Sequence, residues 1–279
     1  MNLPQRLKNE LPRAITNTKS VESVVQETCL LRGIKIKNII GMKNKILIIS
    51  LFLIFFSHLT KGQIIGFEKI DDLKVASWIP KWTIEYQSVY HFGDSEMESE
   101  FILIFGHDKY YGQIKRGSWN DNGTSWIWSY ENLTNIRIEK NKFYSDQTEG
   151  EFVIYDNGQN KIKGLKVDSP WSGLSENSEY EIGTKTSPID EYFNGKYTQA
   201  SKRILSKEEL QKMSNSDLKM MRNEIFARYG YCFSPGGEMD HYFKKQEWYS
   251  AQYKNVNEFL TELEKENIKR IIIVEKETK

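Results

Sequence analysis

Cysteine is scarce in this chain. Cys29 and Cys232 are the two cysteines among 279 residues, and Cys232 alone follows the N-terminal leader described below. A single cysteine cannot form an internal disulfide, even in an oxidising compartment. The segment after the leader must therefore be stabilised by apolar burial, and it is long enough for two modest domains.

A surplus of basic charge is also lacking. The chain has 39 Lys and Arg residues against 38 Asp and Glu residues, and residues 1–62 contain 10 of the former and 3 of the latter. The rest of the chain therefore carries a net charge of −6. A nucleic-acid backbone requires a concentrated basic face, so the composition predicts no nucleic-acid partner.

Catalytic and metal-binding motifs are lacking as well. The sequence contains no HExxH, CxxC, GxSxG or phosphate-loop spacing. We therefore predict no catalytic residue, no metal site and no cofactor. The alternative is a hydrolase or peptidase accessory that uses Cys232 and His241, which a Pro-Gly-Gly turn separates. The aromatic neighbours of Cys232, Tyr231 and Phe233, instead favour a buried structural thiol.

The N-terminal region carries a predicted export signal. Two lysines, Lys43 and Lys45, precede an apolar run at 46–56, and polar residues lead to Gly62. This order is typical of a signal peptide. The apolar run is too short for a membrane-spanning helix, which needs about 20 apolar residues.

We predict a cleavable signal peptide at 42–62 and a cut before Gln63. Translation is expected to begin at Met42, so residues 1–41 are interpreted as a spurious or disordered extension. The alternative is an uncleaved membrane anchor at 46–56.

Residues 63–195 are predicted to form an antiparallel β-rich domain. From Trp82 to Phe92, apolar and polar residues alternate with a period of two. Turn signals such as Asp121-Asn122-Gly123 separate further short runs of this kind. No stretch with a helical period is long enough for a crossover, so a barrel or a sandwich of antiparallel strands is expected.

Six of the seven tryptophans lie in this β-rich half. Trp126 and Trp128 share one face of a predicted strand, and Trp119 lies in a loop rich in Gly, Ser, Asn and Asp. These three residues are candidates for binding a glycan or an apolar ligand. Core packing is the alternative, since aromatic side chains dominate cores as well as interfaces.

Residues 196–279 are predicted to form a small, mainly α-helical domain, which makes the chain an α+β protein. Ser206 with Glu209 has the spacing of a capping box, and a second N-cap cluster begins at Ser214. Gly230 suits a left-handed helix end, and Asn257 is expected to cap the last helix.

Two charged residues lie inside apolar helical stripes. Arg222 falls within the stripe of Leu218, Met221, Ile225 and Tyr229, while Glu264 and Asn267 fall within the stripe of the last helix. An unpaired buried charge costs several kcal/mol. We therefore predict a partly buried ion pair between Arg222 and Glu264, with Asn223 and Asn267 satisfying nearby backbone groups. The alternative is that Arg222 binds an anionic ligand.

The segment from Leu205 to Ile271 resembles a YARHG domain. The residues that carry the resemblance include Arg222, Asn223, Glu224, Phe226, Ala227, Arg228, Tyr229, Gly230, Tyr231, Trp248, Glu264 and Asn267. The family name spells Tyr-Ala-Arg-His-Gly, and this chain has Phe226 and Tyr229 in place of Tyr and His. A tyrosine, with a pKa near 10, cannot replace a histidine base or metal ligand at neutral pH. The position is therefore interpreted as structural, and all of these residues as a structural motif.

The resemblance implies an exported bacterial protein located in the periplasm, on the outer surface or in the medium. It carries over no catalytic role, so a non-enzymatic binding or interaction protein is expected. The expected partner is the cell-wall polymer, a surface glycan or another envelope protein. The alternative is a lipocalin-like carrier with a small apolar ligand inside the β half.

Overall fold

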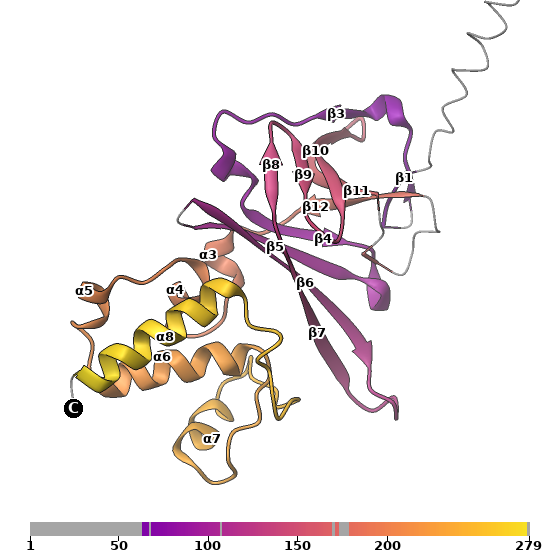
Figure 1. Cartoon of the computed structure of the whole chain (residues 1–279). Helices are drawn as coiled ribbons and strands as arrows, with labels where there is room; N and C mark the ends of the chain where they lie inside the picture. Colours follow the sequence, from indigo (N-terminus) through magenta and orange to yellow (C-terminus); the bar gives the residue numbers. More distant parts are fainter. Residues whose placement is uncertain (1–62, 67, 107, 169–170, 173–178, 278–279) are drawn as a thin grey trace, which may run out of the picture. The chain divides into compact units, whose positions relative to one another are not determined.

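The computed structural model describes residues 63–66, 68–106, 108–168, 171–172 and 179–277. The predicted extension at 1–41 and the predicted signal peptide at 42–62 lie outside these residues. The described residues belong to one compact unit, in which strands come first and helices follow (Figure 1).

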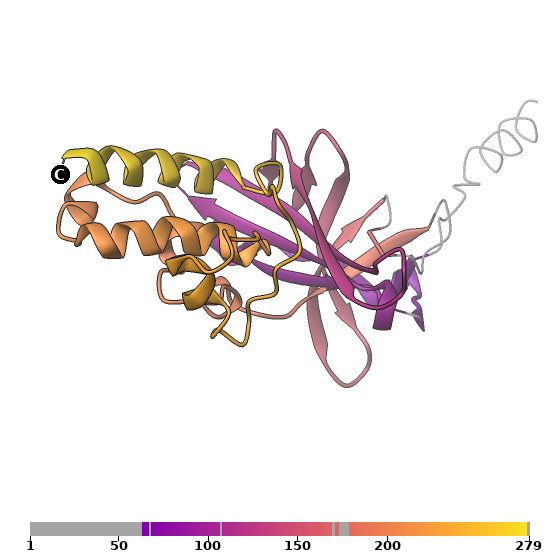
Figure 2. The same ribbon diagram turned by 90° about the horizontal axis from the view of Figure 1, so that it is seen from below.

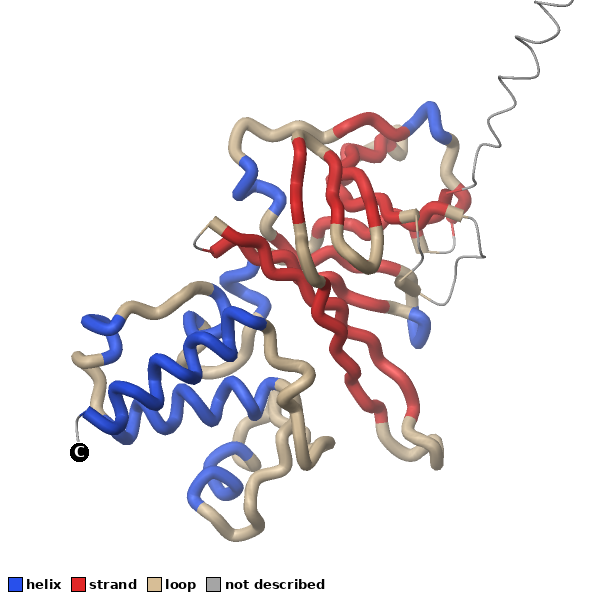
Figure 3. The backbone as a smooth tube through the Cα atoms, in the orientation of Figure 1, coloured by secondary structure: helices blue, strands red, loops and turns tan. Residues whose placement is uncertain are grey.

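The first part of the unit is one twelve-stranded sheet (Figure 3). Its main path runs in the order β7-β6-β5-β4-β12-β11-β10-β9-β8, and β1, β2 and β3 pair beside that path. The pairings are antiparallel, except that β1 runs parallel to β12. The strands are β1 Gln63–Ile65, β2 Glu68–Lys69, β3 Val75–Ser77, β4 Ser88–Phe92, β5 Ser99–Gly106, β6 Lys109–Trp119, β7 Trp126–Leu133, β8 Arg137–Glu139, β9 Lys142–Tyr144, β10 Glu149–Asp156, β11 Lys161–Val167 and β12 Tyr180–Lys185.

The sheet is strongly curved but is not closed into a barrel. Its path ends at β7 and β8, which do not pair with each other among the described residues. Strands from both ends nevertheless contribute to one core, in which Leu133 of β7 and Phe143 of β9 join Phe101 of β5. Of the two predicted arrangements, the closed barrel is therefore excluded, while the antiparallel β-rich character is confirmed.

The predicted strand from Trp82 to Phe92 is wrong in its first half. Thr83–Tyr86 form a 3-10 helix, η2, and the strand begins only at Ser88. The Glu85 side chain accepts a hydrogen bond from the backbone N–H of Trp82 (3.0 Å), which closes this turn. The other 3-10 helices are η1 Asp72–Lys74 and η3 Ser95–Met97.

The second part of the unit is helical. Both predicted N-caps are confirmed, since Ser206 and Ser214 accept hydrogen bonds from the backbone N–H of Glu209 and Asp217. Helices α6 and α8 lie side by side in both views (Figures 1 and 2) and share one apolar core. The helices are α3 Ile189–Tyr192, α4 Gln199–Lys202, α5 Lys207–Leu210, α6 Asn215–Arg228, α7 Glu238–Phe243 and α8 Glu262–Glu277.

Asn257 does not cap the last helix, contrary to the prediction. Helix α8 begins at Glu262, where Thr261 and Glu264 form a capping box. The Thr261 hydroxyl accepts from the N–H of Glu264 (3.2 Å), and the Glu264 carboxylate accepts from the N–H of Thr261 (3.0 Å). In the described part of the chain, no helix combines the length and the apolar character needed to cross a bilayer.

Candidate functional site

The three candidate tryptophans come together on the hairpin of β6 and β7. Trp119 lies directly opposite Trp126, and Gly117 lies opposite Trp128, so all four positions share one face. The ring centroids of Trp119 and Trp126 are 5.4 Å apart, and those of Trp126 and Trp128 are 6.0 Å apart. We call these three side chains the tryptophan row.

Gly117 makes this row possible. A Cβ atom at Gly117 would lie 2.3 Å from the Trp126 ring, a distance that real Cβ atoms essentially never show. The indole therefore lies directly over the glycine backbone. At the Trp128 end of the row, the Lys115 ammonium lies 4.0 Å from the centre of the Trp128 ring, within cation–π range.

The row becomes more exposed towards the hairpin tip. Tyr130, next on the same face, packs edge-on against Tyr229 with ring centroids 4.7 Å apart. Trp128 and Trp126 are half-buried, and Trp119 at the tip is 50% exposed. Core packing therefore accounts for one end of this aromatic stripe, while the other end is open to a ligand.

The free edge of β7 is held by side chains from the helical half. The Gln252 amide accepts from the N–H of Trp128 (3.2 Å) and donates to the carbonyl of Trp126 (3.0 Å). The Tyr253 hydroxyl donates to the carbonyl of Trp128 (2.7 Å). Gln252 and Tyr253 therefore satisfy backbone groups of Trp126 and Trp128 on the edge strand β7, which would otherwise be unpaired.

Gly230 positions those two side chains. Its φ of +71° turns the chain after α6, a backbone conformation that favours glycine. The Gly230 carbonyl then accepts from the N–H groups of Gln252 (2.8 Å) and Tyr253 (2.9 Å). A Cβ atom here would lie 2.8 Å from the carbonyl oxygen of Ser250. Through Gln252 and Tyr253, this glycine links the end of α6 to strand β7, which carries Trp126 and Trp128.

Just before this turn, α6 carries a buried ion pair that the sequence reading missed. Arg228 donates to the carboxylate of Glu224, and both side chains are over nine-tenths buried. Glu224 also accepts from the N–H groups of Lys196 (2.8 Å) and Tyr197 (2.7 Å), and Arg228 donates to the carbonyl of Asn194 (2.8 Å). The pair therefore fixes the chain segment that enters the helical half.

The predicted ion pair between Arg222 and Glu264 does not form. Arg222 instead pairs with Glu275 of α8 (3.1 Å) and is only partly buried. Glu264 is fully buried as predicted, but its carboxylate accepts from the hydroxyl groups of Tyr229 (2.6 Å), Thr261 (3.0 Å) and Ser201. The carboxylate is satisfied by hydroxyl groups and by its own capping box.

Tyr229 occupies the position of the family histidine and acts as a neutral donor. Burial, followed by the negative charge of Glu264, raises the pKa of Tyr229 well above its usual value. Its hydroxyl also lies 3.2 Å from Oε1 of Gln113 on β6, so it joins the helical half to the sheet. Gln113 and Asn132 extend this junction by donating to the carbonyl of Phe259 (2.6 and 3.2 Å).

The remaining motif residues support the same framework. Asn267 donates to the carbonyls of Ala200 (2.8 Å) and Arg203 (2.7 Å), and Asn223 donates to the carbonyl of Lys219 (2.8 Å), as predicted for backbone satisfaction. A small second core surrounds α7 and includes the motif residues Phe226, Ala227, Tyr231 and Trp248.

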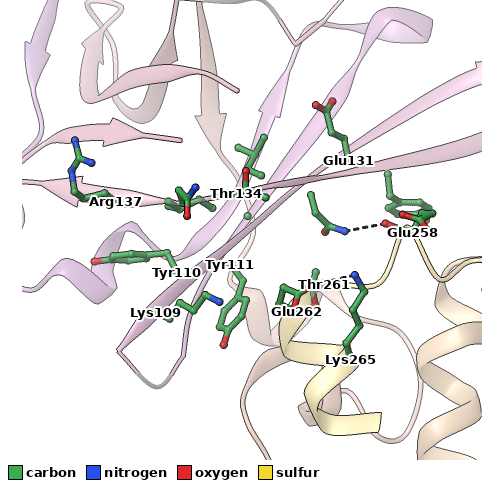
Figure 4. A pocket seen from close by; sticks show the side chains of 16 residues that line it. Lys109, Tyr110, Tyr111, Glu131, Thr134, Arg137, Glu258, Thr261, Glu262 and Lys265 are labelled. Atoms are coloured by element: carbon green, nitrogen blue, oxygen red, sulfur yellow. Dashed lines mark hydrogen bonds and ion pairs between the residues drawn. The ribbon is translucent and has the colours of Figure 1, made fainter. Parts of the chain in front are cut away.

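A cleft of about 810 Å³ opens beside the junction, between the sheet and the start of α8 (Figure 4). Lys109, Tyr111 and Arg137 line its sheet side, and Glu262 and Lys265 line its helical side. Lys265 pairs with Glu262 (3.0 Å), while Arg137 pairs with Glu139 (2.6 Å). The charges that line this cleft are thus largely matched within the chain, and we do not assign it a ligand.

Cys232 and His241 do not form a catalytic pair among the described residues. The exposed His241 directs Nδ1 to the carbonyl of Gly237 (3.0 Å), and no hydrogen bond between His241 and the half-buried Cys232 is found there. No cluster of three or more His, Cys, Asp or Glu side chains in the described ranges has the spacing of a metal site.

Comparison with known families identifies the helical half. Residues 191–276 match the family model of the YARHG domain. The resemblance seen in the sequence is confirmed, and the β-rich half has no family match. Comparison with curated proteins and with solved structures found no match. Glu224, Arg228, Tyr229, Gly230 and Glu264 all lie within the YARHG domain and form the buried framework described above.

Proposed function

We propose that this chain is an exported, non-enzymatic binding protein of the bacterial envelope, and that its tryptophan row holds a cell-wall or surface glycan. The observation that carries the proposal is the row itself: three indole rings that contact one another edge-to-face on one face of a hairpin, with Trp119 half exposed at its tip. Sugar rings present apolar C–H faces that pack on indole rings, while their hydroxyl groups stay hydrated.

Preorganisation supports the same proposal. The Trp126 ring packs on the backbone of Gly117, and the Lys115 ammonium lies over the Trp128 ring. Gln252 hydrogen-bonds the backbone N–H of Trp128 at the strand edge. A ligand that binds a preordered aromatic row loses little free energy in ordering the protein. In this account the YARHG domain supports the row and takes no part in chemistry.

The carrier alternative finds less support. The concave side of the sheet is filled by the chain's own aromatic side chains, which pack ring against ring. Tyr86 stacks on Phe152 with centroids 3.8 Å apart, and Trp171 contacts Phe92 (4.9 Å) and Phe101 (4.8 Å). A small apolar ligand would have to displace this packing, at a cost of several kcal/mol.

The test is sedimentation with insoluble peptidoglycan of the chain from Gln63 onwards. We expect binding by the native sequence and a loss of about tenfold or more in Trp119→Ala, because an aromatic anchor contributes about 2 kcal/mol or more. Trp82→Ala is the matched control, since Trp82 is as exposed (62%) but lies outside the row.

Retained binding in Trp119→Ala and Trp126→Ala, with circular dichroism unchanged, would remove the tryptophan row from the proposal. Failure of the native chain to bind peptidoglycan or any soluble bacterial glycan would refute the glycan assignment.

A further inference from the structure

A second surface, on the β-rich half, concentrates exposed apolar side chains. Ile79 is 63% exposed, Trp82 62% and Ile84 44%, and all three lie within six residues. Single exposed apolar residues are normal on a soluble protein, whereas a cluster of them marks an interaction site. We call residues 79–84 the apolar loop.

The apolar loop is held firmly at both ends. Trp78 and Tyr86, which flank it, are buried and pack edge-to-face with ring centroids 5.0 Å apart. The Tyr86 hydroxyl lies within hydrogen-bond distance of the carbonyls of Trp78 (2.9 Å) and Lys140 (2.8 Å). Glu85, directly after the loop, closes the η2 turn by accepting a hydrogen bond from the backbone N–H of Trp82. The outward direction of the apolar side chains is therefore fixed by the fold.

Several lysines lie at this loop or beside the residues that flank it. The Lys81 ammonium lies 5.2 Å from the centre of the Trp82 ring, and those of Lys163 and Lys185 lie 4.7 and 5.4 Å from the Trp78 ring. Lys140, whose carbonyl contacts Tyr86, is exposed in the turn between β8 and β9.

Two acidic side chains near the loop are already engaged in hydrogen bonds or ion pairs. Glu85 bonds the backbone of Trp82, and Glu151 accepts from Lys142 (2.8 Å) and Ser77 (2.9 Å). The chain after Gly62 carries a net charge of −6, so the lysines near the loop act against the overall charge of this segment.

We propose that the apolar loop docks on the surface of an anionic lipid bilayer. Trp82, Ile79 and Ile84 enter the boundary between headgroups and acyl chains, where an indole ring is favoured. Lys81 and Lys140 remain at the level of the phosphates, each contributing electrostatic attraction to anionic lipid. The combination of tryptophan and isoleucine with nearby lysines suits the boundary of an anionic bilayer, where an indole ring lies at headgroup level and a lysine can reach the phosphates. This contact is independent of the tryptophan row.

The experiment is sedimentation with vesicles, using the chain from Gln63 onwards, which contains the main apolar cores of the β-rich and helical halves and lacks the predicted leader. Vesicles of phosphatidylglycerol and phosphatidylcholine are compared with vesicles of phosphatidylcholine alone. We expect binding to the anionic vesicles that falls at least about tenfold in Trp82→Ala and in Ile84→Ser.

Leu73→Ser is the matched control. Leu73 is the most exposed large apolar residue (93%), but it follows Asp71 and Asp72 and lies outside the loop. We expect this variant and Trp119→Ala to bind vesicles as the native chain does. Absence of binding to anionic vesicles, or equal binding by native chain, Trp82→Ala and Ile84→Ser, would overturn the proposal. An equal loss in Leu73→Ser would show nonspecific apolar adsorption and would overturn it as well.

Discussion

The buried pair of Glu224 and Arg228 offers the sharpest test of the helical framework. Replacing Arg228 by Met removes the guanidinium but keeps an unbranched side chain of similar length. Glu224 would then remain 1% exposed, with the N–H groups of Lys196 and Tyr197 as its remaining donors. The carbonyl of Asn194 would also lose its donor.

The expected loss of stability is large. Removing one partner of a buried ion pair costs about 3–5 kcal/mol, because the other charge stays buried and incompletely compensated. With a urea dependence of about 2 kcal/mol per molar, this loss lowers the unfolding midpoint by about 1.5–2.5 M.

Arg270→Met is the matched control in the same urea titration. Arg270 pairs with Glu266 at the same four-residue spacing and in the same order, but both side chains are 41% exposed. A pair with this exposure contributes about 1 kcal/mol or less, so a small shift is expected. Equal shifts for Arg228→Met and Arg270→Met would refute the reasoning, since burial would then make no difference to the pair.

Further predictions concern the connection to the tryptophan row and the β core. Gly230→Ala places a Cβ atom 2.8 Å from a carbonyl oxygen at a φ of +71°. Thermal unfolding should show that the free energy of unfolding falls by about 1–3 kcal/mol. A fall of less than about 0.5 kcal/mol would contradict the role of this turn. Gln252→Ala releases the edge groups of Trp126 and Trp128. Amide exchange in β7 should accelerate and peptidoglycan binding should weaken several-fold, while unchanged exchange would show that the edge needs no clamp. Burial, followed by Tyr110 and Glu85, raises the pKa of Tyr86 from 10.0 to about 12. The folded state therefore keeps a proton that the unfolded chain releases near pH 10, so this contribution to stability is complete below pH 10 and is lost as the pH rises through about 12. Tyr86→Phe should flatten the decline in unfolding free energy between pH 10 and 12, and an identical slope would contradict the assignment.

Local signals in the sequence predicted local structure well. Ser206, Ser214 and Gly230 act at the helix ends where their side-chain chemistry or backbone freedom is required. Most strands of the β-rich half were predicted from the sequence, because turn residues separate them. Strands β1 to β3 and β12 were missed, because their residues carry too little alternation to be recognised.

Pairings between side chains that are distant in the sequence could not be predicted in the same way. The helical projection placed Arg222 in the buried stripe, whose predicted members included neither Glu224 nor Arg228. In the structure, the segment around Asn194 and Tyr197 covers that polar side of α6, and the two charges become buried there. This segment has no helical or strand period, so no projection reveals what it covers. The Thr261-x-x-Glu264 spacing was a visible capping signal that could have assigned Glu264 correctly.

The tryptophans show a similar limit. Their common face was predicted for Trp126 and Trp128, but the register that brings Trp119 opposite Trp126 depends on the whole hairpin. The proposed ligand of this row is a glycan.

Hydrogen–deuterium exchange with solubilised peptidoglycan strands tests that proposal most directly. The account predicts that saturating glycan slows amide exchange in residues 115–128, which carry the tryptophan row, and leaves α6 and α8 unchanged. Protection confined to the cleft at Lys109 and Lys265, or no protection in the hairpin at saturation, would contradict it.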